Sequence, residues 1–343
     1  MKASWWKTVL KYAIGVALLT YTITSNWESH DEKIGLREAL SKPIRVEIYA
    51  LAAVLVAFNT ALTFVRWYLL VRAQNLPFTL KSAFRLGLVG YFYNTFLPGA
   101  VGGDLLKAAY IAREQERRTV AVATVLLDRA IGLWGLVVVV ALTGSGFWLL
   151  APDMMRSQPY LRQTVTIALG LLAATVAVWG VLGVLPEHRA QRFAERLRSI
   201  PKVGGAMSEF WKAVWLYRLK GKTILVALGL SLMGHTCSVL AFYFAVVMFQ
   251  PAGDLSGMPG LREHFLVVPV GMVVQGFFPT PGGVGGGELM YKWLYEVVLG
   301  FPAYLGILGS LGVRVLSWVF GASGYVAHTF MKRDHEELVP PPE

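Results

Sequence analysis

The sequence contains little charge, one cysteine and six histidines, and each shortage excludes a class of protein. Charged residues make up 15% of the 343 positions, whereas soluble domains carry about a quarter. Cys237 cannot form an intrachain disulfide, and cysteine-based metal sites are excluded as well. The sequence has no Walker-type phosphate loop and no aminoacyl- or glycosyl-transferase pattern. We therefore expect no metal and no cofactor, and we assign no catalytic residue.

Hydrophobic residues, in contrast, are abundant. They make up 55% of the chain and give a mean hydropathy of +0.52, which is typical of an all-α polytopic membrane protein. The net charge of +11 would suggest nucleic acid as the partner of a soluble protein. Here the basic residues cluster in loops between apolar runs, as the positive-inside rule describes. We expect no nucleic-acid partner, and we expect a basic face that attracts anionic lipids.

Six apolar runs predict helices that cross the bilayer completely. The first run follows Lys2, Lys7 and Lys11 and resembles a signal peptide. No small-x-small cleavage site follows it, so we expect a retained helix. The predicted spans cover residues 8–25, 46–71, 119–150, 163–185, 223–249 and 302–330.

Four further apolar runs are too short to cross, because a span needs about twenty residues. Residues 83–97 and 105–112 flank the glycine-rich sequence LPGAVGGD, and residues 264–278 and 289–299 flank PTPGGVGGGE. Each pair predicts a re-entrant hairpin, which enters and leaves the membrane on one side. An unpaired backbone amide costs several kcal/mol in hydrocarbon, so we expect both glycine-rich tips to face a polar cavity.

The two hairpins resemble copies of each other. PGAVGG in the first matches PGGVGG in the second, and an acid follows each copy, Asp104 or Glu288. About 25 residues after each acid lies an intramembrane arginine, Arg129 or Arg314. Two copies in opposite orientation are typical of inverted-topology transporters, whose broken helices meet near the bilayer midplane.

The arginine-rich loops orient the chain. A cytoplasmic N-terminus places them inside, places loops 151–162 and 250–262 outside, and makes the two hairpins enter from opposite sides. Residues 186–222 carry nine lysines and arginines and predict a cytoplasmic pair of amphipathic helices on the membrane surface. We expect a multi-pass protein of a bacterial plasma (inner) membrane with both termini cytoplasmic. The expected single integral membrane domain, 1–343, comprises a first helix and outer loop (1–45), a first repeat (46–150) with hairpin 83–112, a linking helix (163–185), the basic segment (186–222), a second repeat (223–331) with hairpin 264–299, and a cytoplasmic tail (332–343).

The glycine-rich turns predict an anion site, because they expose amide donors and the helix start that follows adds partial positive charge. Asp104 and Glu288 complicate this expectation, since each could cap its helix, pair with Arg129 or Arg314, bind a substrate amine or carry a proton. Asp128 could pair with an arginine and pin two helices together, or contact substrate beside Arg129. Bare charges near the midplane are costly. We therefore expect these three acids and two bases to form one connected, water-accessible network.

Four other polar residues receive structural roles. Arg66 lies nearer a helix end and could extend its charge to the interface, so it is a weaker candidate. Asn94 and Gln275 precede the two turns and are expected to bond the freed backbone groups. His235 is expected to be a buried, hydrogen-bonded histidine rather than a ligand.

Three stretches, YFYNTFLPGAVGGDLLKAAYIAR, LLDRAIGL and FFPTPGGVGGGE, resemble the lysylphosphatidylglycerol synthase transmembrane-region family. The resemblance covers residues 45–331 and implies an integral lipid translocase or a relative of one. The best-known members join a lipid-flipping membrane region to a cytosolic aminoacyl-tRNA-dependent transferase, and many others are the membrane part alone. No transferase domain follows Phe330 here, so we do not expect this chain to make lysyl-lipids. The candidate substrate-binding residues, which match the family motifs or belong to the turns, are Pro98, Gly99, Gly102, Gly103, Asp104, Asp128, Arg129, Pro281, Gly282, Gly283, Gly285, Gly286, Glu288 and Arg314.

We expect a flippase-like transporter that moves a polar or anionic lipid headgroup through a cavity between the hairpins. Rocking of the inverted halves would give alternating access, with the turn amides and both arginines holding the phosphate. The alternatives are an intramembrane lipid-modifying transferase that uses the same charges, and a non-catalytic partner of such an enzyme. The expected partners are membrane lipids and, in this last alternative, a separate lipid-modifying transferase.

Overall fold

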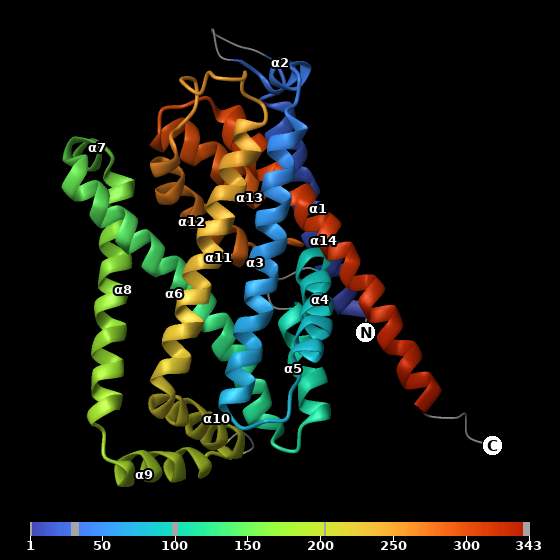
Figure 1. Cartoon of the computed structure of the whole chain (residues 1–343), viewed down its shortest axis with the longest axis vertical. Coiled ribbons are helices and arrows are strands. Elements are labelled where there is room, and N and C mark those ends of the chain that lie inside the picture. Colours follow the sequence, from blue (N-terminus) through green and yellow to red (C-terminus); the bar gives the residue numbers. More distant parts are fainter. Residues whose placement is uncertain (1, 29–33, 98–101, 202–203, 339–343) are drawn as a thin grey trace.

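The computed structural model describes residues 2–28, 34–97, 102–201 and 204–338, and every regular element in them is a helix. Figure 1 shows a bundle whose long helices run along one axis, with α9 (Glu187–Arg198) lying crosswise at one end. The prediction of an all-helical membrane protein is confirmed. Within the described residues, five helices are long and apolar enough to cross a membrane: Val46–Ala73, Arg118–Leu150, Pro159–Val184, Met207–Val247 and Ala303–Val326.

The sixth expected span lies in α1 (Lys2–Thr24), which is helical but is not among these five. It carries three lysines and four threonines. The helix packs against the second glycine-rich turn, because a Cβ added to Gly15 would lie 3.2 Å from Thr280 Cβ. The exact number of full spans stays a prediction.

The short runs form two pairs of short helices. The first pair is α4 (Leu80–Phe96) with α5 (Gly102–Glu114). The second is α12 (Leu261–Phe277) with α13 (Gly286–Trp293), which continues as the π-helical turn η2 (Leu294–Val298). The longest has 17 residues and spans about 26 Å, less than the roughly 30 Å of a hydrocarbon core. In Figure 1 the first pair occupies the lower half of the bundle and the second pair the upper half. Their entry into the membrane from opposite sides stays a prediction.

The residue before a proline ends the first helix of each pair. Leu97 precedes Pro98 and Phe278 precedes Pro279 in the sequence, and both have extended backbones, with ψ of 148° and 134°. The proline ring clashes with a helical residue before it, so the helix stops there. The same steric rule therefore begins the turn in both hairpins.

The second glycine-rich turn packs directly on the end of α4. A Cβ added to Gly282 would lie 2.9 Å from the Thr95 carbonyl oxygen, and Gly282 has a φ of +55°. Only glycine combines this backbone conformation with so close an approach. The two hairpins thus meet backbone to backbone in the middle of the bundle.

The two predicted repeats pack on each other reciprocally. The helices α3 (Val46–Ala73), α4, α5 and α6 (Arg118–Leu150) follow the order long, short, short, long. The helices α11 (Gly221–Val247), α12, α13 and α14 (Ala303–Leu338) follow the same order. Helix α3 packs on α11, α6 packs on α12, and α14 packs on α4. The contact of α3 with α11 joins corresponding helices, and the contact of α6 with α12 has its counterpart in the contact of α14 with α4, as in two copies related by a pseudo-twofold axis.

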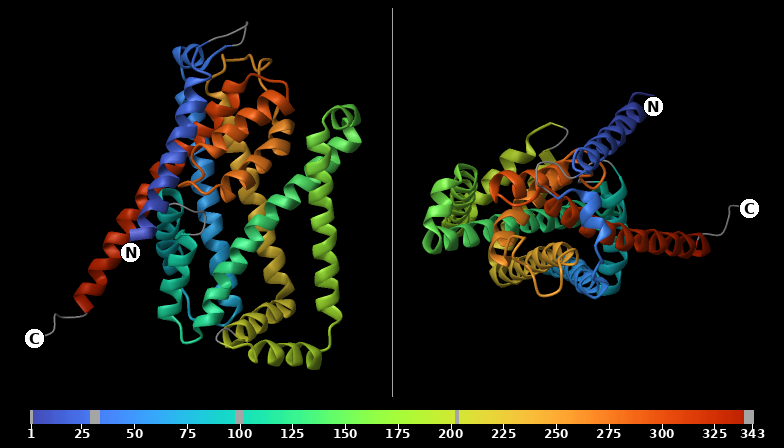
Figure 2. Two further views of the ribbon diagram at one scale, coloured as in Figure 1. Left: turned by 180° about the vertical axis from the view of Figure 1, so that it is seen from behind. Right: turned by 90° about the horizontal axis from the view of Figure 1, so that it is seen from above.

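The basic segment forms a helix pair at one end of the bundle. Helix α8 (Pro159–Val184) stands at the edge (Figure 2), and the chain then turns into α9 and α10 (Gly204–Tyr217). Ala190 on α9 is buried, and its carbonyl accepts a hydrogen bond from Trp211 Nε1 of α10 at 3.0 Å. The remaining short helices are α2 (Leu36–Ser41), α7 (Pro152–Ser157) and η1 (Arg218–Lys220).

Cysteine labelling tests the orientation of this segment. The positive-inside rule places the basic helix pair in the cytoplasm, so a membrane-impermeant maleimide added to intact cells should not label Gly205→Cys. Gly257→Cys, in the loop at the other end, should react readily. Both glycines have open space around them, and Cys237 is buried. Ready labelling at 205 together with protection at 257 would reverse the topology.

The contact between α4 and α5 requires glycine at one position of the first turn. A Cβ on Gly103 would clash with the Gly90 carbonyl and would lie 2.8 Å from Asn94, whereas a Cβ on Gly102 would meet Leu97 at an ordinary 3.5 Å. Gly103→Ala should therefore lower the stability by about 1–3 kcal/mol. Gly102→Ala is the matched control, and its melting temperature in detergent should stay near the wild-type value. Equal losses in both variants would contradict the close packing described here.

Candidate functional site

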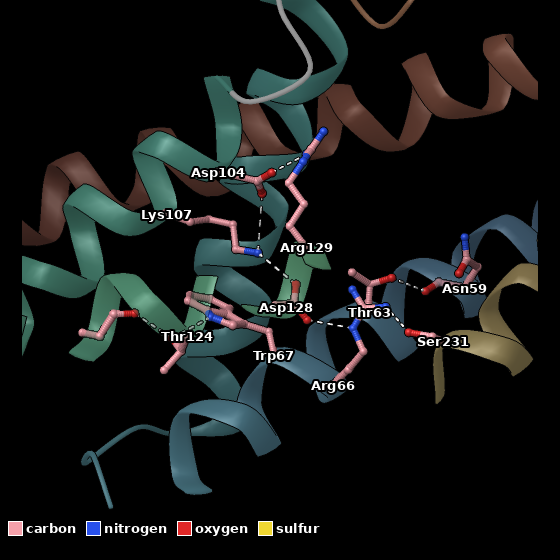
Figure 3. A network of polar contacts seen from close by, with 11 residues as sticks. Asn59, Thr63, Arg66, Trp67, Asp104, Lys107, Thr124, Asp128, Arg129 and Ser231 are labelled. Atoms are coloured by element: carbon pink, nitrogen blue, oxygen red, sulfur yellow. Dashed lines mark hydrogen bonds and ion pairs between the residues drawn. The ribbon is translucent and has the colours of Figure 1, made fainter. Parts of the chain in front are cut away.

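The first acid–arginine pair joins α5 to α6. Arg129 Nη1 donates to Asp104 Oδ2 at 2.5 Å across 25 residues of sequence. Asp104 lies in the first turn of α5. Its side chain is 12% exposed, and that of Arg129 is 27% exposed. Figure 3 shows the guanidinium and the carboxylate pointing toward each other. The spacing in the sequence thus corresponds to a direct ion pair.

The second acid–arginine pair joins α13 to α14 and is buried more deeply. Arg314 Nε donates to Glu288 Oε1 across 26 residues, and the two side chains are 3% and 0% exposed. The other carboxylate oxygen accepts the Gly285 backbone N–H at 2.7 Å. Glu288 therefore caps its helix and pairs with the arginine, so two of the alternatives considered for this acid hold together.

Asp128 pairs with Arg66, not with either of the repeat arginines. Arg66 Nε donates to Asp128 Oδ1 at 2.7 Å, and its Nη1 donates to Ser231 Oγ at 2.6 Å. Arg66 is buried within α3, so the expectation that it extends toward the interface is wrong. Successive residues on a helix point in different directions, which is why Asp128 and Arg129 face separate partners. The pair fixes α3, α6 and α11 to one another.

Lys107 completes this group of charges and was missed in the sequence. Its Nζ lies 4.0 Å from Asp104 Oδ1 and 3.8 Å from Asp128 Oδ2, and it sits 4.3 Å from the centroid of the Trp67 ring (Figure 3). The i,i+3 spacing to Asp104 was the available signal, because it places both side chains on one face of a helix.

The two added bases reverse the sign of the buried charge. The sequence suggested three acids and two bases, a net charge of −1. The structure adds Arg66 and Lys107, so four bases face three acids and the net charge is +1. No hydrogen bond or ion pair among the described residues joins the Glu288–Arg314 pair to the other five side chains, so the expected single network is instead two separate groups.

A cavity of about 350 Å³ lies between the hairpins, and both repeat arginines line it. Arg129 reaches it from α6, and Arg314 reaches it from α14 together with Gly282 and Gly283 of the second turn. The other residues with polar side-chain atoms in its wall are Asn59, Thr60, Tyr91, Asn94, Thr95, Ser238, Gln275, Tyr291, Ser310, Ser317 and Trp318. The repeats thus contribute one arginine each to a shared polar space.

Two side chains at the rim hold the turns, as expected from the sequence. Asn94 Oδ1 accepts the Gly103 backbone N–H at 2.8 Å. Gln275 Nε2 donates to the Gly282 carbonyl at 3.2 Å. His235 likewise has the expected structural role, since its Nε2 lies 2.8 Å from the Gly132 carbonyl of α6.

Four amides of the second turn already have hydrogen-bond acceptors. The N–H groups of Gly283, Val284 and Gly287 donate to carbonyls nearby in the same turn, and that of Gly285 donates to Glu288. These four amides are therefore not free to hold a phosphate, and Arg314 bonds the Gly282 carbonyl. A phosphate at the remaining amides of this turn stays a prediction. Pro98 and Gly99 of the first turn lie outside the described residues. The other candidates fall at the two turns and helix starts: Gly102 and Gly103 begin α5, Pro281 is buried in the second turn, and Gly286 begins α13 against the Phe278 ring.

Glu288 and Asp104 should differ in their contribution to stability. Glu288→Ala leaves Arg314 unpaired in a buried position, which costs about 3–5 kcal/mol, so folded protein should be lost. Asp104→Ala leaves Arg129, which water reaches, and should cost clearly less. Thermal unfolding in detergent measures both variants. A smaller loss for Glu288→Ala than for Asp104→Ala would contradict this ranking.

Comparison with known proteins agrees with the fold and with the repeated motifs. The profile of the family described as "Lysylphosphatidylglycerol synthase TM region" matches residues 8–324. The chain is also similar to a protein named UPF0104 membrane protein from Methanothermobacter thermautotrophicus, with 25% identity over 304 residues that cover 82% of this chain and 84% of that protein. No solved structure matches it. Because the family profile extends from the first helix into the last, the chain belongs to the lysylphosphatidylglycerol synthase transmembrane-region family.

Proposed function

We propose that this protein is a lipid translocase that moves an anionic headgroup between the two membrane leaflets. The observation that carries the proposal is the cavity of about 350 Å³ that Arg129 and Arg314 line from opposite repeats. Guanidinium groups bind phosphate through two parallel hydrogen bonds. Membership of a membrane-region family named for a lipid synthase is consistent with lipid as the substrate.

The charge balance favours an anion over a cation. The seven charged side chains near the cavity sum to +1 within the described residues. An unbalanced charge at membrane depth is costly, and a phosphodiester, which carries one negative charge, would neutralise it. A lipid with a single phosphate therefore matches both the size of the excess and its sign.

The two arginines have different capacities to bind the headgroup. Arg314 already donates to Glu288 and to the carbonyls of Gly282 and Gly283, at 2.9 and 3.4 Å. Arg129 makes one side-chain hydrogen bond among the described residues, to Asp104, and is more exposed. Arg129 thus has donors available for a phosphate, whereas Arg314 mainly holds the second turn in shape.

Movement would come from the two repeats rocking against each other around this cavity. We place α9 and α10 with both termini on the cytoplasmic side of a plasma membrane, where the arginines of α9 would meet anionic lipids. The headgroup would pass between the hairpins while its acyl chains stay in the bilayer. Membrane lipids are thus the proposed ligand, and an enzyme that modifies them would be a suitable separate partner.

Reconstitution tests the role of Arg129. The purified protein is reconstituted into vesicles that contain fluorescent phosphatidylglycerol, and dithionite is added outside. If the protein moves lipid between the leaflets, dithionite should quench the fluorescence of both leaflets. Arg129→Ala should slow this movement roughly tenfold or more, because it removes charge-assisted hydrogen bonds to the phosphate. Arg129→Lys should restore it only in part, since lysine lacks the planar fork.

The matched control is Arg156→Ala, which removes an exposed arginine of α7 outside the cavity and should leave transport unchanged. Thermal stability is measured for each variant beside transport. A folded Arg129→Ala protein that transports at the wild-type rate would disprove the headgroup role. A change in lipid mass on incubation with the purified protein would favour the transferase alternative instead.

A further inference from the structure

Lys107 occupies an unusual position between two carboxylates. Its ammonium group is 4.0 Å from Asp104 and 3.8 Å from Asp128, beyond the roughly 2.7–3.2 Å of a hydrogen bond to either. Asp104 is the partner of Arg129, and Asp128 is the partner of Arg66 (Figure 3). The lysine is therefore a third cation shared by two acids that each already have a closer one.

The surroundings of Lys107 hold its stem and leave its end group near both acids. A Cβ on Gly90 would lie 2.6 Å from Lys107 Cδ, so the glycine provides the space that the stem fills. The face of Trp67 lies 4.3 Å from the ammonium group and supports its charge. A shift of about 1 Å in the end group would bring it within hydrogen-bond distance of Asp104.

Binding of an anion at Arg129 would weaken the ion pair between Arg129 and Asp104. If Arg129 turns both of its Nη groups toward a phosphate, Nη1 moves away from this carboxylate, whose side chain is 12% exposed. A buried charge that loses its partner is strongly unfavourable. Anion binding would thus be opposed unless another cation took the place of Arg129. Lys107 lies one helical turn along α5, on the same face as Asp104.

We propose that Lys107 is a positioning residue that takes over Asp104 when Arg129 engages the anion. Asp128 can spare the lysine, because Arg66 holds it at 2.7 Å in either state. The exchange keeps every buried acid paired while it frees the Nη1 group of Arg129 that Asp104 holds. The inference rests on the proposed function in one respect, namely that Arg129 meets the phosphate.

The second repeat lacks this arrangement. Tyr291 follows Glu288 by three residues, as Lys107 follows Asp104, and it is buried with its hydroxyl donating to the Val268 carbonyl at 3.2 Å. Within the described residues no second cation forms an ion pair with Glu288, and Arg314 stays bound to Glu288 and to the turn. Among the described residues, the repeat acid that contacts two cations is thus the one in the first repeat, which agrees with the greater exposure of Arg129.

Charge-matched double variants test the exchange. The binding of dioctanoyl phosphatidylglycerol to the purified full chain in detergent is measured by microscale thermophoresis, beside thermal stability. Lys107→Met keeps the shape of the stem but removes the charge, and it should weaken binding roughly tenfold, because Asp104 then retains Arg129. Adding Asp104→Asn should restore binding, since a neutral amide needs no cation.

Lys107→Met with Asp128→Asn has the same net charge as this rescued variant but keeps the Asp104 carboxylate, so its binding should stay weak. Rescue by both second substitutions alike would show that only the total charge matters and would overturn the exchange. Asp104→Asn alone gives a test that does not depend on the folding of Lys107→Met. It should bind at least as tightly as the wild type, and weaker binding would overturn the proposal.

Arg129→Ala in the same assay separates this inference from the proposed function. If Arg129→Ala binds normally, the headgroup role of Arg129 fails and the exchange fails with it. If Arg129→Ala loses binding while a folded Lys107→Met binds like the wild type, the exchange fails and the proposed function stands.

Discussion

The ion pair between Glu288 and Arg314 makes an unwound glycine turn possible at the centre of a membrane protein. Backbone groups without partners are too costly to leave in a medium of low dielectric constant. Here the arginine donates to the carbonyls of Gly282 and Gly283, and the glutamate accepts the Gly285 N–H. One buried pair therefore satisfies its own charges and the polar backbone beside it. The shape of the second turn, and through it the wall of the cavity, depends on this pair.

Local sequence rules predicted much of this arrangement. The apolar runs 83–97 and 264–278 predicted where the first helix of each pair ends, and the repeated spacing of acid and arginine gave both ion pairs as one of its alternatives. Asn94 and Gln275 were assigned to the turns because a freed backbone group needs a nearby partner. These predictions succeeded because each depends on residues that are close in the chain or copied between the repeats.

The partners of Asp128 depended on contacts that the sequence does not encode locally. Arg66 lies 62 residues away on α3, and only the packing of α3 against α6 brings the two together. The distance of Arg66 from a helix end does not reveal its depth, because the neighbouring helices cover it. Lys107 lies on the short helix α5, and only the folded structure brings that helix to the charged centre. These two omissions were enough to give the buried charge the wrong sign.

The contact of Gly282 with the Thr95 carbonyl has a consequence for how the interior becomes wet. Since Gly282 has no side chain and meets the Thr95 backbone, the turn and the end of α4 can part at this point without a rotamer change at either residue. Parting would uncover peptide groups rather than hydrocarbon, so the newly opened surface would be hydrophilic. Water could then enter between the turn and α4 together with the headgroup. This water would replace the hydration that the phosphate loses when it leaves the membrane surface.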